Sequence, residues 1–178
     1  TFLSAYGDLV PEMQLVVEPE PLGTGGALRY AMEQVRSSVF VVLNGDSWIW
    51  QPVASVLAEH QRVQRACTIV AVQASHVTGR ALNKGRLRIG AHDRLEDVTT
   101  QEAVTDGWVN AGIYVLDRAM VASWPKGSYS FEAHLPALVK GYHAGVFRSQ
   151  GRLLDIGTPE CYAWANRALE SLISVVGS

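Results

Sequence analysis

A run of five apolar residues followed at once by Asn-Gly-Asp constrains this chain more than any other segment. Residues Val39–Leu43 read Val-Phe-Val-Val-Leu, and Asn44, Gly45 and Asp46 come directly after them. A continuous apolar run rich in β-branched side chains and bounded by turn residues is typical of a strand buried on both faces. In an open α/β sheet, ligands bind at the carboxyl ends of such strands. The segment therefore predicts an internal strand that carries Asp46 to a binding edge.

A strand, a glycine-rich loop and a helix are predicted before this strand. Gln14–Glu18 is a short, mostly apolar run, and residues 19–26 read Pro-Glu-Pro-Leu-Gly-Thr-Gly-Gly. The prolines exclude a regular helix here, and the glycines permit close backbone approach. From Ala27 to Arg36 the apolar residues have a helical period, so we expect the loop to open onto a helix N-terminus, which favours an anionic or strongly polar ligand. The resulting βαβ unit predicts an α/β fold with a mostly parallel sheet.

Composition limits the kind of molecule and its partners. A length of 178 residues suits a single domain, and the formal net charge of −2 gives no general reason to expect nucleic acid or an anionic membrane as a partner. No apolar run reaches membrane-spanning length and no signal peptide is evident, so we expect a soluble cytoplasmic protein. Cys67 and Cys161 lie far apart among apolar residues, which favours reduced, buried thiols.

Two later segments bring polar residues to the ends or interior of predicted strands. Val109–Leu116 is an apolar strand interrupted by Asn110, Ala111 and Gly112, and a glycine inside a strand often marks the close approach of a ligand or backbone. Arg152–Ile156 is a predicted strand that contains Asp155, and Thr158-Pro159-Glu160 after it is a strong helix-start signal. The remaining predicted strands are 67–72, 86–90, 95–98 and 144–149, and the remaining helices begin at 52, 117, 130 and 159.

Two further features have plain structural interpretations. His60 lies on the apolar face of a predicted helix, where a structural role is favoured. The basic stretch between Arg80 and Arg94 could contact phosphate, but a solvated surface is the favoured interpretation.

Asp46 and Asp155 form a candidate metal site. Each follows or ends a predicted strand, and two carboxylates at one edge of a sheet, facing a loop that can hold a nucleotide, suit a hard divalent cation. Mg²⁺ commonly takes one or two carboxylates and completes its octahedron with waters and substrate phosphates. Taken singly, a glycine loop is more often a turn and an aspartate after a strand is more often a cap. In combination they favour phosphoryl or nucleotidyl transfer.

Four segments in this order resemble the sugar-1-phosphate nucleotidyltransferases. They are residues 20–27 (Glu-Pro-Leu-Gly-Thr-Gly-Gly-Ala), 43–47 (Leu-Asn-Gly-Asp-Ser), 110–114 (Asn-Ala-Gly-Ile-Tyr) and 155–162 (Asp-Ile-Gly-Thr-Pro-Glu-Cys-Tyr). The resemblance covers nearly the whole chain. Among the branches of the family, the D-glycero-D-manno-heptose 1-phosphate guanylyltransferases are the most similar, with the mannose-1-phosphate guanylyltransferases nearby.

The resemblance implies a fold, a reaction and a set of site residues. The fold would be a Rossmann-like, three-layer α/β/α structure, and the reaction would transfer GMP from GTP to a sugar 1-phosphate, giving an NDP-sugar and pyrophosphate for lipopolysaccharide, capsule or S-layer glycan synthesis. Asp46 and Asp155 would hold Mg²⁺. The nucleotide would lie along Leu22, Gly23, Thr24, Gly25, Asn44 and Gly45, and the sugar would meet Asn110, Ala111 and Gly112.

The chain departs from the family pattern in three places. The family's opening strand and its Gly-x-Gly-Thr-Arg loop are absent, so we expect residues 1–178 to be a single, N-terminally truncated domain with little activity by itself. Residues 98–102 (Val-Thr-Thr-Gln-Glu) lack the lysine that relatives place there for the sugar phosphate, and a nearby arginine is the candidate substitute. Pro21 stands where some relatives have a base-reading glutamine, which leaves base reading to backbone groups.

Several alternatives remain open at this stage. Another sugar, such as mannose 1-phosphate or N-acetylmuramate 1-phosphate, or another nucleotide could be used. The domain could also bind a nucleotide-sugar without making it, and a homo-oligomer is possible because a missing first strand would leave a sheet edge bare.

Overall fold

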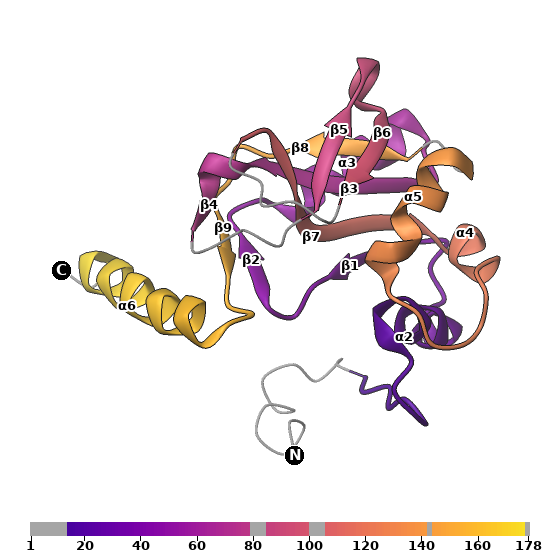
Figure 1. The fold of residues 1–178 in the computed structure, drawn as a ribbon, viewed down its shortest axis with the longest axis horizontal. Helices are drawn as coiled ribbons and strands as arrows, with labels where there is room; N and C mark the ends of the chain where they lie inside the picture. Colours follow the sequence, from indigo (N-terminus) through magenta and orange to yellow (C-terminus); the bar gives the residue numbers. More distant parts are fainter. Residues whose placement is uncertain (1–13, 79–84, 100–105, 142–143, 177–178) are drawn as a thin grey trace.

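The computed structural model describes residues 14–78, 85–99, 106–141 and 144–176, and it contains one larger and one smaller β-sheet with helices packed around them (Figure 1). The larger sheet has the order β6-β5-β7-β3-β8, and β1 also pairs with β7. The smaller sheet has the order β2-β9-β4. The larger sheet comprises β1 (Val39–Leu43), β3 (Cys67–Gln73), β5 (Arg86–Ile89), β6 (Leu95–Thr99), β7 (Trp108–Asp117) and β8 (Gly145–Arg148). The smaller one comprises β2 (Ser47–Ile49), β4 (Val77–Thr78) and β9 (Leu153–Asp155).

The larger sheet is mixed rather than mostly parallel. Strand β3 runs parallel to β8, and both β1 and β3 are antiparallel to β7, so β1, β3 and β8 share one direction and β7 opposes them. The hairpin of β5 and β6 is also antiparallel, and β5 is antiparallel to β7. The connection between β5 and β6 is too short for the crossover that parallel strands need. The predicted α/β class is therefore confirmed, with a reversed strand in the middle of the sheet.

Helices cover both faces of the larger sheet, as the three-layer prediction requires. The helices are α2 (Gly23–Ala31), α3 (Val53–Val63), α4 (Arg118–Ala122), α5 (Phe131–Gly141) and α6 (Pro159–Val176). Ile69 and Tyr114 belong to a core on one face with Leu135 of α5, whereas their neighbour Val70 belongs to a second core on the other face with Val56 of α3. This alternation follows from the period of two in a strand.

The amino-terminal prediction is wrong in two details. Residues Gln14–Glu18 are irregular and largely exposed, not a strand, because no strand among the described residues pairs with them. Helix α2 begins at Gly23 rather than after the glycines, so the predicted glycine loop is the first turn of the helix. Strand β1 has its predicted bounds, but it is only partly buried and Leu43 is 58% exposed.

The other predicted elements are largely confirmed. Directly after Asp46 lies strand β2, which the sequence pattern does not predict. His60 is buried, and its ring nitrogens lie 2.9 Å from Thr68 Oγ1 and 3.3 Å from Asp117 Oδ1, which fits the structural role.

Thr158 caps α6, since its hydroxyl accepts the amide proton of Cys161 at 3.2 Å. Helix α6 projects away from the rest of the protein (Figure 1), and its residue Tyr162 is 56% exposed. Across the helices that the structure describes, none has the length and hydropathy needed to cross a lipid bilayer.

Both cysteines are free and buried, as predicted. Burial and, to a smaller extent, the nearby negative charge of Asp117 together raise the pKa of the Cys67 thiol to about 12. Only the thiolate is an effective nucleophile, so Cys67 is held in its unreactive form.

We predict that a thiol-alkylating reagent at pH 8 leaves Cys67 unmodified in the folded protein and modifies it in urea. Because folding raises this pKa, the folded state holds the proton more tightly, and the thiol makes stability fall as the pH rises from about 9 towards 12. Peptide mapping by mass spectrometry distinguishes Cys67 from Cys161. Equal modification of Cys67 with and without urea would contradict the prediction.

Candidate active site

The pairing of β2 with β9 places Asp46 beside Asp155. Ser47 is the register partner of Asp155, and the amide of Ile156 donates to the carbonyl oxygen of Asp46 at 2.8 Å. The sequence predicts that Asp46 and Asp155 lie at the carboxyl ends of parallel strands in one sheet. The structure instead brings the two residues together through an antiparallel ladder in the smaller sheet, which starts one residue after Asp46 and ends at Asp155.

Gly157 leaves a space between the two carboxylates. A methyl group on Gly157 would lie 3.0 Å from Asp46 Oδ2 and 3.1 Å from Asp155 Oδ1. The Gly157 amide donates to Asp155 Oδ1 at 2.8 Å, and the Ser47 hydroxyl donates to Asp46 Oδ1 at 3.1 Å. These hydrogen bonds fix the directions of both carboxylates. In the described part of the chain, no cluster of three or more His, Cys, Asp or Glu forms a metal site, so a cation here would complete its shell with water and substrate oxygens.

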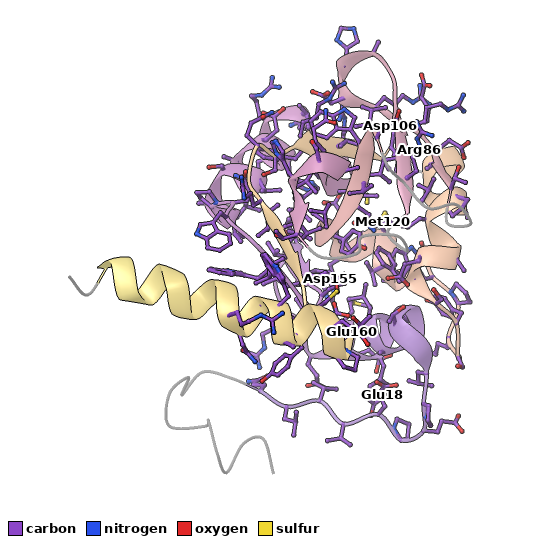
Figure 2. The ribbon with its side chains drawn as sticks, turned by 60° about the vertical axis from the view of Figure 1, so that its left-hand side comes forward. Glu18, Arg86, Asp106, Met120, Asp155 and Glu160 are labelled. Carbon is purple, nitrogen blue, oxygen red and sulfur yellow. The ribbon has the colours of Figure 1, made fainter. Side chains whose placement is uncertain are left out.

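A cleft of about 520 Å³ opens beside Asp46. It runs between helix α2 and the end of β1, and its polar lining includes Glu18, Thr24, Asn44, Asp46 and Glu132. An adjoining hollow of about 700 Å³ lies along residues 17–27 and shares Glu18 and Thr24 with the cleft. Figure 2 shows Asp155 and Glu160 where α6 begins, near the body of the protein. The predicted nucleotide segment and Asp46 therefore border one continuous depression.

The glycines of the predicted nucleotide segment pack against this chain's own residues. Gly25 and Gly26 are buried, and the Gly25 amide donates to the Tyr129 carbonyl oxygen at 3.0 Å. A methyl group on Gly25 would overlap the Tyr129 ring, and one on Gly26 would overlap the carbonyl oxygen of Gly127. Gly23 has a φ of +66°, which favours glycine. The binding role of Gly23 and Gly25 stays a prediction, while their packing role is visible.

Leu22 and Thr24 also have partners within the chain. The Leu22 amide donates to Glu18 Oε2 at 2.8 Å, and its carbonyl oxygen accepts the Tyr129 amide proton at 3.0 Å. The Thr24 hydroxyl accepts the Phe131 amide proton at 2.9 Å and donates to Glu132 Oε2 at 3.0 Å. These contacts connect the start of α2 to the start of α5.

The Asn110-Ala111-Gly112 segment forms an irregularity in β7 that contacts the Asp46 turn. The Gly112 amide donates to Asn110 Oδ1 at 3.0 Å, and the register with β3 shifts at this level. Gly112 has a φ of +74°, and a methyl group there would lie 2.9 Å from Asn44 Nδ2. The Asn44 amide in turn donates to the Gly112 carbonyl oxygen at 2.9 Å. The close approach predicted for Gly112 is therefore confirmed, and Asn44 is the neighbour.

Asn110 and Ala111 are placed differently from each other. Asn110 is buried and donates to the Tyr114 hydroxyl oxygen at 2.6 Å. Burial raises the pKa of Tyr114, the bond from Asn110 opposes this, and the negative charge of Glu132 raises it further. The Ala111 side chain belongs to the core on the other side of the sheet, so only its backbone could meet a sugar.

Two carboxylates in the cleft, Glu18 and Glu132, were not predicted as site residues. Glu132 lies in the first turn of α5 after the cap residue Ser130. An acidic side chain is ordinary in this place, so its position carried no functional signal. Glu18 was assigned to a strand. In the sequence, only its position three residues before Pro21, close to the predicted nucleotide segment, could have indicated that Glu18 is a site residue.

The described arginines of the predicted basic stretch do not line the cleft. Arg86 lies 3.3 Å from Asp106, and Arg88 lies 3.9 Å from Glu96 and 3.7 Å from Asp97. These pairs, of which Arg86 and Asp106 are labelled in Figure 2, agree with a solvated charged surface. Arg80, Lys84 and residues 100–102 lie outside the described residues. Among the described residues that line the cleft, none is lysine or arginine.

A comparison with protein families identifies the kind of domain. The family model described as nucleotidyl transferase matches residues 3–171. The chain belongs to the nucleotidyl transferase family. The predicted family resemblance is thereby confirmed, and the cleft beside Asp46 lies in a domain of this family.

Individual relatives agree with this assignment. The chain is 28% identical to the mannose-1-phosphate guanylyltransferase of Mycobacterium tuberculosis over 89% of its length and 45% of the relative. It is 25% identical to the D-glycero-alpha-D-manno-heptose 1-phosphate guanylyltransferase of Campylobacter jejuni, over 82% of the chain and 62% of the relative. The chain thus spans about half to two thirds of these relatives.

The fold is shared with a solved structure. The crystal structure of HddC from Yersinia pseudotuberculosis complexed with GMP-PN has a TM-score of 0.78 and 24% sequence identity, covering 94% of this chain and 73% of that one. The nucleotidyltransferase fold is therefore present in the described residues.

We predict that Gly26→Ala lowers the free energy of unfolding by about 1–3 kcal/mol, because its methyl group would press on the backbone of residue 127. Gly141→Ala is the control, since nothing lies within 4 Å of that position, and its effect should stay within about 1 kcal/mol. Urea denaturation measures both variants. Equal stability of the two variants would show that α2 does not need this close packing.

Proposed function

We propose that the complete protein transfers GMP from GTP to a sugar 1-phosphate, releasing pyrophosphate and forming a GDP-sugar. The observation that carries the proposal is the placement of Asp46 and Asp155 around Gly157 in a nucleotidyl transferase domain, with Asp46 bordering a cleft. D-glycero-D-manno-heptose 1-phosphate is the proposed acceptor, because two of the relatives are heptose 1-phosphate guanylyltransferases. Mannose 1-phosphate is the alternative, which the mycobacterial relative favours.

The carboxylate pair fits Mg²⁺. Two carboxylate oxygens flank the same small space, which a methyl group on residue 157 would fill, and oxygen ligands suit this hard cation. Asp46 and Asp155 would hold the ion, whose charge would offset the negative charge that gathers between the reacting phosphates. The hydrogen bonds from Ser47 and Gly157 keep these two carboxylates in place before substrate arrives.

The residues of the cleft would act mainly by positioning. In the proposed reaction, a phosphate oxygen of the sugar 1-phosphate attacks the α-phosphorus of GTP, one P–O bond forms, and the bond to the β-phosphate breaks. Little covalent chemistry is required of the protein, so alignment of the two substrates is its main contribution. Leu22, Gly23 and Gly25 lie along the nucleotide side in this proposal. Asn110 and Gly112, next to Asn44, lie on the sugar side.

Glu18 supports guanine as the base. Its side chain borders both the cleft and the adjoining hollow, and the Leu22 amide fixes one of its oxygens at 2.8 Å. An ionised carboxylate only accepts hydrogen bonds. The Watson–Crick edge of guanine presents two adjacent donors, N1–H and the 2-amino group, whereas adenine presents an acceptor at N1. A side chain can therefore read the base here, in addition to the backbone groups expected from Pro21.

The proposed product fits the cytoplasmic synthesis of activated heptose for surface glycans. Both substrates are small phosphorylated molecules, and the proposal requires neither nucleic acid nor a membrane. Association into a homo-oligomer is compatible with it, since β1 has only β7 as a partner among the described strands.

The central test measures pyrophosphate release by the complete gene product with GTP, Mg²⁺ and a panel of sugar 1-phosphates. We expect Asp46→Asn and Asp155→Asn each to reduce the rate at least about 100-fold, because each removes charge from the metal site. Gly157→Ala should raise the Mg²⁺ concentration needed for half-maximal rate. Asp106→Asn is the control, since that carboxylate is 83% exposed and paired with Arg86.

Two results would count against this proposal. Absence of pyrophosphate release with every nucleotide and sugar phosphate would exclude the transferase activity, and calorimetric binding of a GDP-sugar would then favour a binding module. Equal activity of Asp46→Asn and wild type would remove the carboxylate pair from the mechanism. A preference for mannose 1-phosphate in the panel would replace heptose while keeping the reaction.

The base assignment has its own test, which is the kcat/KM value for GTP divided by that for ITP. ITP lacks the 2-amino group, so we expect the wild type to prefer GTP by about tenfold, the value of one hydrogen bond to a charged group. Glu18→Gln should bring this ratio close to one. Glu20→Gln is the matched control in the same hollow and should keep the wild-type ratio. An unchanged ratio in Glu18→Gln would return base reading to the backbone.

A further inference from the structure

The Glu132 carboxylate is held by two hydroxyl groups from different parts of the chain. The Thr24 hydroxyl donates to Glu132 Oε2 at 3.0 Å, and the Ser130 hydroxyl donates to the same oxygen at 2.9 Å. The other oxygen, Oε1, has no hydrogen-bond or ion-pair partner among the described residues. One oxygen therefore anchors the side chain and leaves the other available to a ligand.

The Thr24 hydroxyl is itself held in place by a second hydrogen bond. Its hydroxyl oxygen accepts the amide proton of Phe131 at 2.9 Å, the first residue of α5. The first amides of a helix have no partner inside the helix, so this bond satisfies one of them. Thr24 lies in the first turn of α2. Its hydroxyl therefore makes two hydrogen bonds to α5, as donor to Glu132 and as acceptor from the Phe131 amide.

Glu132 follows Phe131, whose ring packs against the tyrosine that contacts Asn110. Its charge acts on the Tyr114 hydroxyl, which accepts the hydrogen bond from Asn110 at 2.6 Å. The Tyr114 ring also meets the ring of Phe131 edge to face, with centroids 4.6 Å apart. Glu132 borders the same cleft as Asn44 and Asp46. Phe131, which precedes Glu132 in α5, and the buried Tyr114 therefore connect this part of α5 with Asn110.

We propose that Thr24 is a positioning residue for the sugar phosphate, which it serves by holding Glu132 towards the hydroxyl groups of the acceptor. The inference rests on the proposed function for the identity of the acceptor. Under this inference Thr24 serves the acceptor, whereas its place in the glycine-rich segment predicts a nucleotide-binding role. A carboxylate fixed in one orientation binds a sugar hydroxyl without first losing rotamer freedom, so the tether strengthens binding.

The test compares Thr24→Val with Thr24→Ser. Valine keeps the shape and removes the hydroxyl, whereas serine keeps the hydroxyl. For Thr24→Val we expect the KM for the sugar phosphate to rise about tenfold and the KM for GTP to change less than about twofold. Thr24→Ser should restore most of the acceptor affinity. Calorimetric titration with mannose 1-phosphate and with heptose 1-phosphate gives the same comparison without turnover.

Glu132→Gln keeps the inference testable if valine disturbs α5. This variant leaves the bond between Thr24 and the Phe131 amide in place, and we expect it to weaken acceptor binding at least as much as Thr24→Val. Adding Thr24→Val to Glu132→Gln should then cause little further loss, since residues that act through one contact are not additive.

Three outcomes would overturn the inference. They are a rise in the GTP KM with unchanged acceptor binding, full additivity of the two substitutions, and a wild type that binds neither sugar phosphate. Acceptor binding that weakens in Thr24→Val, in a protein that releases no pyrophosphate, would support the inference while refuting the proposed transferase reaction.

Discussion

The ladder between β2 and β9 is the contact on which the rest of the site depends. These two strands are three residues long each and come from segments more than 100 positions apart, yet they bring Asp46 and Asp155 to the two sides of Gly157. Neither carboxylate belongs to the larger sheet. Because a hydrogen-bonded register is discrete, a shift of one residue in this ladder would move one carboxylate to the other face of the small sheet. The two carboxylates would then lie apart.

Strand β7 connects this small sheet to the core of the domain. It pairs with β1, β3 and β5, and the interruption at Asn110 to Gly112 occurs where it passes the Asn44 turn. A strand with a residue at positive φ and a shifted register costs stability unless neighbours hold it. The buried bond between Asn110 and Tyr114 and the reciprocal contact of Gly112 with Asn44 supply that support. The geometry next to Asp46 is thus fixed from within the core.

The start of α2 shows how one segment serves packing and binding together. Its glycines let the helix approach residues 127–131, and the same approach allows Thr24 to reach both Phe131 and Glu132. A side chain larger than hydrogen at these positions would separate α2 from α5 and release the Glu132 carboxylate. Glycine in a segment of this kind therefore need not signal direct ligand contact. It can act through the distance between two helices, each of which borders the cleft.

The sequence by itself determined the elements whose residues follow a local period or a local cap. Strands β1, β3 and β7, helix α3 and the start of α6 at Thr158 were predicted almost to the residue. The closeness of Asp46 and Asp155 was also predicted, and both lie beside Gly157. Local patterns specify these features because strand alternation, helical period and capping depend on near neighbours. The family resemblance then supplied the proposed reaction.

Tertiary structure alone decided which segments meet. Residues 14–18 fit a strand pattern but have no partner strand among the described residues, and the glycine segment became helix because α5 packs against it. The reversed direction of β7, the β2–β9 ladder and the place of Glu18 and Glu132 in the cleft all depend on contacts between distant segments. No periodicity encodes such contacts, because the free energy that selects them comes from burial and hydrogen bonds that exist only in the folded chain.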